Sequence, residues 1–285
     1  EDFVEHLFVA NTHSYILFFT DKGKCYWVKV YDIPEGGRAA KGRAIVNLIG
    51  CEPDEKVSAF ISVKEFNDDH YVVMATEKGM VKKTKLSAYS NPRKKGIYAV
   101  EIRDGDKLIE ARVSTGDNDI LLGTRNGKSI RFSEEQIRAS GRKTMGVKGI
   151  TLSSEDDRLV GMLLIKREGT VLVATEKGFG KRTEISQSRA QKRGGKGVLT
   201  MKTTDKVGKM VTIKEVVDKD DLMIITNQGV LIRLPVAQIR SIGRATQGVK
   251  LIKLGEGTLV SSITRIMSEE EEDENNNTES TEPKE

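Results

Sequence analysis

Lysine and arginine recur beside glycine in five segments of the chain, and residues of these types could bind phosphate groups. Cations attract phosphates and release their counterions, while glycine lets the backbone approach closely and donate its N–H groups. A single cation is most often a solvated surface charge, but recurrence at one place in every repeat favours a shared surface for a polyanion. The candidate DNA-binding residues in these segments are Arg38, Lys41, Arg43, Arg93, Lys94, Lys95, Arg142, Lys143, Lys148, Arg189, Arg244 and Lys250.

The fourth of these segments contains the sequence QKRGGKG, in which three cations alternate with glycines. We expect this stretch to contact phosphate through both side chains and backbone, although an exposed flexible loop with ordinary surface lysines would have the same composition. A nucleotide-binding P-loop is a poor alternative, because the chain has no G-x-x-x-x-G-K-[ST] pattern. The residues of the stretch are Gln191, Lys192, Arg193, Gly194, Gly195, Lys196 and Gly197.

A second set of cations occurs four residues after a recurring glycine. These residues are Lys83, Arg131, Arg182 and Arg233, whereas the first copy has Trp27 at the same place. We expect the four cations to contribute to the same DNA-binding surface.

The elements that carry these residues are five copies of a short apolar run followed by T-x-x-G. Their glycines, which are Gly23, Gly79, Gly127, Gly178 and Gly229, are separated by 56, 48, 51 and 51 residues. Each copy predicts a β-hairpin, because the run suits a strand and the glycine supplies the positive φ of a tight turn.

A basic loop and a further strand follow each hairpin, which makes about four strands per 50 residues. This pattern predicts an all-β, propeller-like fold of four-stranded blades within residues 1–267, in which each blade packs against its neighbours. The expected repeats are 4–56, 57–108, 109–159, 160–210 and 211–259, and residues 260–267 are expected to be the first strand of a partial sixth repeat. The sequence leaves the number of blades and the closure of the ring open.

Charge is distributed unevenly along the chain. The formal net charge is +5, but residues 268–285 alone carry −8, which leaves about +13 on residues 1–267. Such a basic body favours a nucleic-acid partner. The acidic tail is expected to be disordered and either to increase solubility or to mimic DNA and compete for the basic surface.

Several classes of function are not indicated by the sequence. Cys25 and Cys51 lack metal-ligand spacing, the three histidines are scattered, and no nucleophile has a paired base, so we expect no catalytic residue, metal or cofactor in this chain. No apolar stretch is long enough to cross a membrane, and a reduced cytoplasmic setting is expected. Because residue 1 is glutamate, we expect the chain to be part of a longer protein.

Four segments of the chain resemble the C-terminal domain of the DNA gyrase A subunit. They are EDFVEHLFVANTHSYILFFTDKGKCYWVKVYDIP, GRAIVNLI, RASGRKTMGVKGITL and GRATQGVKLIKL. The resemblance implies a β-pinwheel, in which neighbouring blades exchange strands, and a basic outer rim that wraps duplex DNA without sequence specificity. It also implies a bacterial cytoplasmic enzyme of A2B2 composition, in which the catalytic core of the A subunit and the gyrase B subunit use ATP and magnesium to introduce negative supercoils.

One feature departs from the family pattern. The family's signature heptapeptide, Q-R-R-G-G-K-G, normally precedes a segment like EDFVEHL, whereas here the near match is in the fourth repeat. An alternative is the C-terminal domain of a topoisomerase IV A subunit, which guides DNA without strong wrapping. A propeller that binds only proteins is a further alternative, which would predict apolar patches in place of the repeated cations.

Overall fold

The computed structural model describes residues 10–36, 42, 44–166 and 169–266. The chain divides into two compact units. The described residues of the three-sheet unit lie within 10–166 and 189–198, and those of the two-sheet unit lie within 169–188 and 199–266.

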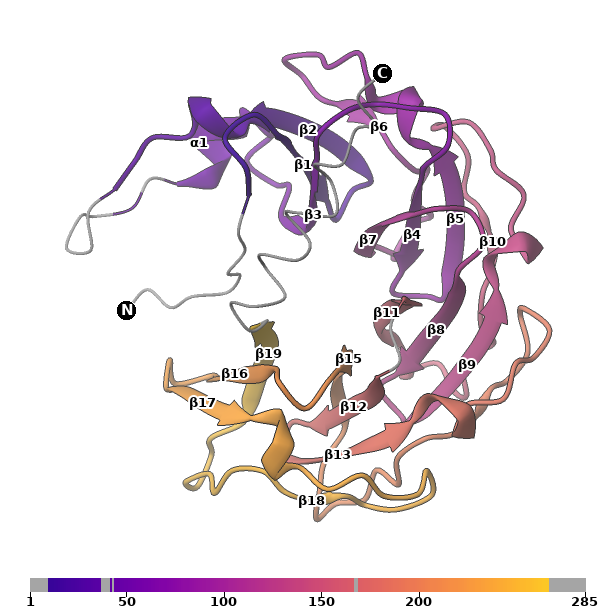
Figure 1. Cartoon of the computed structure of the whole chain (residues 1–285), viewed down its shortest axis with the longest axis vertical. Coiled ribbons are helices and arrows are strands. Elements are labelled where there is room, and N and C mark those ends of the chain that lie inside the picture. The colour runs from indigo at the N-terminus through magenta and orange to yellow at the C-terminus, as the bar shows by residue number, and fades with distance from the viewer. Residues whose placement is uncertain (1–9, 37–41, 43, 167–168, 267–285) are drawn as a thin grey trace, which may run out of the picture. The chain divides into compact units, whose positions relative to one another are not determined.

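The three-sheet unit consists of three four-stranded sheets of antiparallel hairpins and added strands (Figure 1). The first sheet has the order β3-β1-β2-β6, the second β10-β5-β4-β7 and the third β11-β8-β9-β14. The strands are β1 (Tyr15–Thr20), β2 (Lys24–Lys29), β3 (Val57–Val63), β4 (Tyr71–Thr76), β5 (Met80–Lys85), β6 (Ile97–Tyr98), β7 (Leu108–Ser114), β8 (Asp119–Thr124), β9 (Lys128–Ser133), β10 (Val147–Lys148), β11 (Leu159–Ile165) and β14 (Val198–Leu199). The short helices are η1 (Val30–Asp32), α1 (Ile45–Ile49), η2 (Leu86–Tyr89) and η3 (Glu134–Gln136).

The two-sheet unit repeats the same design. Its first sheet has the order β15-β12-β13-β18, and its second has three strands in the order β17-β16-β19. The strands are β12 (Thr170–Thr175), β13 (Phe179–Glu184), β15 (Met210–Val216), β16 (Asp221–Thr226), β17 (Leu231–Pro235), β18 (Val249–Lys250) and β19 (Val260–Ile266). The helices η4 (Ile185–Gln187) and η5 (Val236–Gln238) follow the hairpins of these two sheets.

All five predicted hairpins are present, and the T-x-x-G sequence explains their turns. In the first, Gly23 has a φ of 78° and its N–H donates to the Thr20 carbonyl at 2.9 Å. The other four turn glycines have φ between 76° and 83° and donate to the equivalent threonine. Positive φ is the conformation that favours glycine, so the motif fixes the position of each turn.

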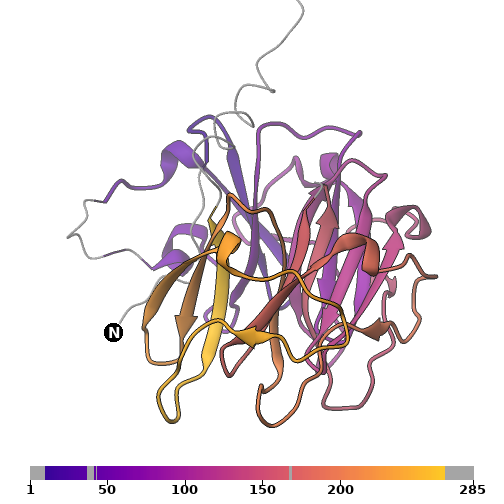
Figure 2. The same ribbon diagram turned by 60° about the horizontal axis from the view of Figure 1, so that its bottom comes forward.

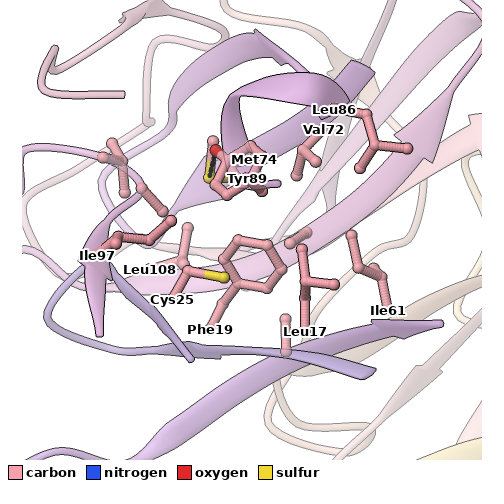
Figure 3. Packing of buried hydrophobic residues seen from close by; sticks show 14 of the residues in the cluster. Leu17, Phe19, Cys25, Ile61, Val72, Met74, Leu86, Tyr89, Ile97 and Leu108 are labelled. Atoms are coloured by element: carbon pink, nitrogen blue, oxygen red, sulfur yellow. Dashed lines mark hydrogen bonds between the residues drawn. The ribbon is translucent and has the colours of Figure 1, made fainter. Parts of the chain in front are cut away.

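Within each unit the core lies between successive sheets, because the first strand of each hairpin is apolar on both faces. Leu17 and Phe19 of β1 pack against Val72 and Met74 of β4, as Figure 3 shows. The opposite face of β4 packs in turn against β8. The Phe19 ring meets the Tyr89 ring edge to face, with 5.9 Å between their centroids. A strand buried on both faces reads as a continuous apolar run, which is the pattern of the repeats.

Strand exchange between repeats is seen within each unit. The two-residue strand β6 follows the second hairpin in the sequence, yet it pairs with β2 of the first hairpin, with Lys24 opposite Tyr98. Strands β10 and β18 pair with β5 and β13 in the same way. The structure therefore confirms an all-β fold of exchanged, propeller-type blades.

The sequence-based division of the repeats differs from the structure in one respect. Strand β3 was expected to begin the second repeat, but it pairs with β1 and completes the first sheet. Likewise, the expectation that residues 260–267 begin a sixth repeat is wrong, because β19 pairs with β16 and is the third strand of the fifth sheet. Figure 2 shows the same strands in a view turned by 60° from that of Figure 1.

Candidate nucleic-acid interface

Four cationic loops within the described residues lie on the second hairpin strand of the preceding sheet, and a glycine in each loop makes this close approach possible. A Cβ atom at Gly146 would lie 2.4 Å from the Val81 carbonyl oxygen, and one at Gly197 would lie 2.5 Å from that of Ser129. Both glycines also have positive φ. Packing therefore requires glycine at positions 146 and 197, and the arginines four residues earlier, Arg142 and Arg193, are carried on loops whose base is fixed.

Three of these loops contact one another in the three-sheet unit. They are residues 92–98, 138–148 and 189–198, which we call the cationic loop surface. Nη1 of Arg142 donates to the Tyr98 carbonyl at 3.2 Å, and Nζ of Lys143 lies 5.8 Å from the centre of the Tyr98 ring. Nη1 of Arg193 donates to the Lys148 carbonyl at 2.6 Å. These contacts join the cations of successive loops into one surface.

Most of the predicted loop cations face solvent. Arg93, Lys94, Lys95, Lys143, Lys148, Arg189, Lys192, Lys196 and Lys250 are exposed, and Arg142, Arg193 and Arg244 are partly exposed. Arg38, Lys41 and Arg43 lie outside the described residues.

The QKRGGKG stretch is a folded loop with one structural cation and two solvent-facing ones. The backbone N–H of Arg193 donates to Oε1 of Gln136 at 2.8 Å, and its Nε donates to the Gln136 carbonyl at 3.2 Å. The Gly194 N–H donates to the Gly149 carbonyl at 2.8 Å, so this loop is tied to the preceding loop. Lys192 and Lys196 remain exposed.

The second set of cations does not form the exposed group that its spacing suggested. Lys83 is 7% exposed, and its Nζ donates to the Glu134 carbonyl at 3.1 Å and lies 3.6 Å from the Glu134 carboxylate. Arg182 is 8% exposed, and its Nε donates to the Ile239 carbonyl at 2.8 Å. Both cations thus bond to the short helical turn after the next hairpin, at Glu134 and Ile239. The expectation that they are exposed to DNA is wrong, because both are buried.

The other two members of that set pair with an acid twelve residues earlier in the same hairpin. Nε of Arg131 lies 2.7 Å from Oδ2 of Asp119, and Nε of Arg233 lies 2.6 Å from Oδ2 of Asp221. The same diagonal position holds Tyr71 beside Lys83, whose Nζ is 5.0 Å from the ring centre. This recurring position therefore stabilises hairpins, and Arg233 alone of the four is highly exposed.

Sequence reasoning missed two exposed arginines of the loops, Arg138 and Arg240. They occupy the position of Arg189 in their own repeats, two residues after the end of the short helix that follows each hairpin. Aligning IRA, SRA and IRS across the three repeats would have found them. It also missed Lys82 and Lys181, which are buried beneath two of the loops.

Among the described residues, no three His, Cys, Asp or Glu side chains group in a way that could hold a metal ion. No helix in the described ranges is long and apolar enough to span a membrane.

Comparison with known families decides the identity of the repeats. The model of the DNA gyrase C-terminal domain, described as a β-propeller, matches residues 14–64, 70–115, 118–166, 169–216 and 220–266. The chain belongs to this family. Each matched segment begins at a hairpin and ends with the third strand of the same sheet, so the family's repeat coincides with the sheets of the structure.

Relatives within the gyrase family are similar along almost the whole chain. The DNA gyrase A subunit of Staphylococcus epidermidis is 45% identical over 273 residues, which cover 95% of this chain and 30% of that protein. The Salmonella typhimurium A subunit is 42% identical over 266 residues, which cover 93% of this chain and 30% of that protein. The chain thus spans about a third of the length of these relatives.

Solved structures show the same fold. A DNA gyrase A C-terminal domain superposes with a TM-score of 0.79 at 23% identity, covering 90% of this chain and 84% of that one. The C-terminal domain of a DNA topoisomerase IV superposes with a TM-score of 0.84 at 25% identity, covering 95% of this chain and 85% of that one.

Proposed function

We propose that this chain binds duplex DNA on its cationic loops and wraps it, as the DNA-wrapping part of a gyrase. The observation that carries the proposal is the connected set of loops at 92–98, 138–148 and 189–198, on which the exposed lysines and arginines of three successive repeats lie together. A cation track that continues from one repeat to the next follows a phosphate backbone, whereas isolated surface charges do not.

The energy of wrapping sets how many contacts are needed. Bending a short duplex smoothly by about 40–90° costs on the order of 1–6 kcal/mol, so many phosphate contacts must offset the cost. The cationic loop surface offers several exposed cations, and the loop at 240–250 offers two, Arg240 and Lys250. These are lysines and arginines beside glycines, which suit phosphate contacts more than a base-specific array, and we expect binding without sequence specificity.

The remaining steps of the proposal concern the whole enzyme. Wrapped DNA would be presented to the catalytic core of the A subunit with a fixed crossing hand. Strand passage, driven by ATP with magnesium at the gyrase B subunit, would then introduce negative supercoils in the bacterial cytoplasm. Within an A2B2 enzyme this chain would supply binding and geometry, and the chemistry would occur elsewhere.

A second candidate is the corresponding domain of topoisomerase IV, which would guide DNA without wrapping it strongly. The similarity to a topoisomerase IV C-terminal domain, with a TM-score of 0.84, favours keeping this candidate. Relatives that are 42–45% identical and are gyrase A subunits favour the first.

The binding part of the proposal is tested by measuring affinity for a duplex at several salt concentrations. Each phosphate contact contributes about 0.9 to the slope of log K against log salt, so a wrapped duplex predicts a steep slope. Replacing Lys94, Lys95 and Lys143 by alanine together should make the slope shallower. Replacing the exposed Lys22, Lys78 and Lys177 of the hairpin turns is the matched control, since it removes the same charge away from the loops. Equal losses from both triple variants would refute a role for the loops.

A further inference from the structure

Two lysines are buried directly beneath cationic loops. Lys82 is 1% exposed, and its Nζ donates to the Ala99 carbonyl at 2.5 Å and to the Arg142 carbonyl at 2.6 Å. Lys181, in the two-sheet unit, is fully buried, and its Nζ donates to the Gly243 carbonyl at 2.7 Å and also to the Arg244 carbonyl. In both cases the buried ammonium donates to at least one backbone carbonyl of the loop above it.

The two lysines occupy one repeat position, three residues after the turn glycine. The loops above them share the pattern G-R-x-T-x-G, at 141–146 and 243–248. In both loops the threonine hydroxyl donates to the carbonyl of the first glycine at 3.0 Å. The loop type and the buried lysine therefore occur together in two separate repeats.

A third repeat shows what happens without the lysine. Ile130 occupies the same position beneath QKRGGKG, and there the loop is fixed by its own Arg193. An apolar side chain has no donor for loop carbonyls, so a loop of this kind must satisfy its polar groups by other contacts. A lysine thus lies beneath each G-R-x-T-x-G loop, whose carbonyls need a donor, and an isoleucine lies beneath the QKRGGKG loop, which Arg193 fixes instead.

We propose that Lys82 and Lys181 are positioning residues, which hold the backbones of Arg142 and Arg244 in the orientation that presents these loops to DNA. The inference rests on the proposed function, since it assigns a role in a DNA-binding surface. An ammonium that donates to the Arg142 or Arg244 carbonyl fixes the loop from below.

Electrostatics give the proposal a second consequence. Burial lowers the pKa of Lys82 to about 7 and that of Lys181 to about 8, and the positive charge of Arg142 or Arg244, respectively, acts in the same direction. Arg138 lines the same shallow hollow as Lys82 and adds a further positive charge. Phosphates beside the loop favour the charged lysine, because an opposite charge stabilises the ionised form. DNA binding near pH 7.5 is therefore expected to take up protons at these two lysines.

The test combines the variant Lys82→Met with the loop variant Arg142→Ala/Lys143→Ala in a double-mutant cycle on the 285-residue chain. Affinity for a duplex is measured at pH 6.5, well below the melting temperature of every variant. If Lys82 acts through the loop, each variant weakens binding by about 5-fold, and the combined variant weakens it far less than the product of the two. Ile130→Met is the matched control, because the loop above it loses no hydrogen bond, and its affinity should be unchanged.

The outcomes separate the two proposals. No effect of Arg142→Ala/Lys143→Ala would count against DNA binding at this loop. A clear effect of that variant, with Lys82→Met either silent or fully multiplicative, would overturn the positioning role while leaving the proposed function in place.

Proton uptake supplies an independent readout if Lys82→Met does not fold. Lys82→Gln keeps two donors for the carbonyls but cannot take a proton, and Lys181→Met tests the same role in the other unit. Calorimetric titration with DNA at pH 7.5, in two buffers of different ionisation enthalpy, should show proton uptake that falls in each variant. Equal uptake in the wild type and in both variants would contradict the proposal.

Discussion

Nε and Nη2 of Arg131 both lie 2.7 Å from one carboxylate oxygen of Asp119, diagonally across the β8–β9 hairpin. The pair occupies the repeat position where other hairpins place Trp27 beside Tyr15, at 5.0 Å between ring centroids, or Lys83 beside Tyr71. Such diagonal contacts stabilise antiparallel strands. A cation that recurs in the sequence can therefore serve the fold, and its role must be separated from binding by experiment.

Replacing Arg131 with alanine should lower stability and leave DNA binding unchanged. The pair is partly exposed, with side-chain exposures of 23% and 28%, so the expected loss is about 1 kcal/mol of unfolding free energy. Urea unfolding gives the stability, and duplex titration gives the affinity. A large loss of affinity with intact stability would contradict the assignment of Arg131 to the fold.

Within the QKRGGKG loop, the two kinds of cation should respond differently to alanine. Lys192 and Lys196 face solvent, so each replacement should reduce the salt slope of DNA binding by about 0.9 without changing stability. Arg193→Ala should lower stability as well, because its guanidinium donates to the carbonyls of Gln136 and Lys148. If all three variants changed the salt slope equally and left stability intact, the structural role of Arg193 would be wrong.

The loop glycines offer a test of the close approach between loop and hairpin. Gly146→Ala places a Cβ at 2.4 Å from the Val81 carbonyl oxygen in a backbone with φ of 78°, and should cost about 2 kcal/mol or more of stability. Gly141, in the same loop, has no atom within 4 Å of a built Cβ, so Gly141→Ala should change stability by less than about 0.5 kcal/mol. Thermal unfolding compares the two, and equal effects would show that the loop is not packed as described.

Stability should depend on pH through Lys82. Its pKa falls from 10.5 to about 7 in the folded chain, because burial disfavours the ammonium. The unfolded chain therefore binds more protons between these two values, and unfolding free energy rises with pH in that range by up to about 1.4 kcal/mol per unit for this one group. Below pH 7 both states are protonated and the contribution is constant. Denaturant unfolding from pH 7.5 to 9 should give a steeper rise in the wild type than in Lys82→Met, and identical slopes would contradict it.

The hairpins and cationic loops could be predicted from the sequence because their signals are local. A threonine and a glycine three residues apart define each turn, and a glycine a few residues after an arginine marks each cationic loop. The sheet to which β3 or β19 belongs could not be predicted, since an apolar run can pair with the hairpin before it or after it. Only the three-dimensional pairing of β1 with β3 settles this point.

The roles of individual cations were hidden for a related reason. Lys82 and Lys83 are adjacent in the sequence, and both are buried because a loop some 60 residues later covers one and a turn some 50 residues later holds the other. Spacing within the hairpin carries no information about such distant partners. The loop cations are mostly exposed, as expected of basic loops because charged side chains are rarely buried in groups, and their binding of DNA stays a prediction.

The wrapping of DNA is tested most directly by ligating a nicked circular duplex in the presence of the chain and then measuring its linking number. If the chain wraps DNA, ligation should trap positive writhe in proportion to protein, and the effect should fall as salt rises. The variant Lys94→Ala/Lys95→Ala/Lys143→Ala should trap less writhe at equal occupancy of the DNA. Saturating binding with an unchanged linking number would contradict wrapping, and would favour a domain that guides DNA without bending it around itself.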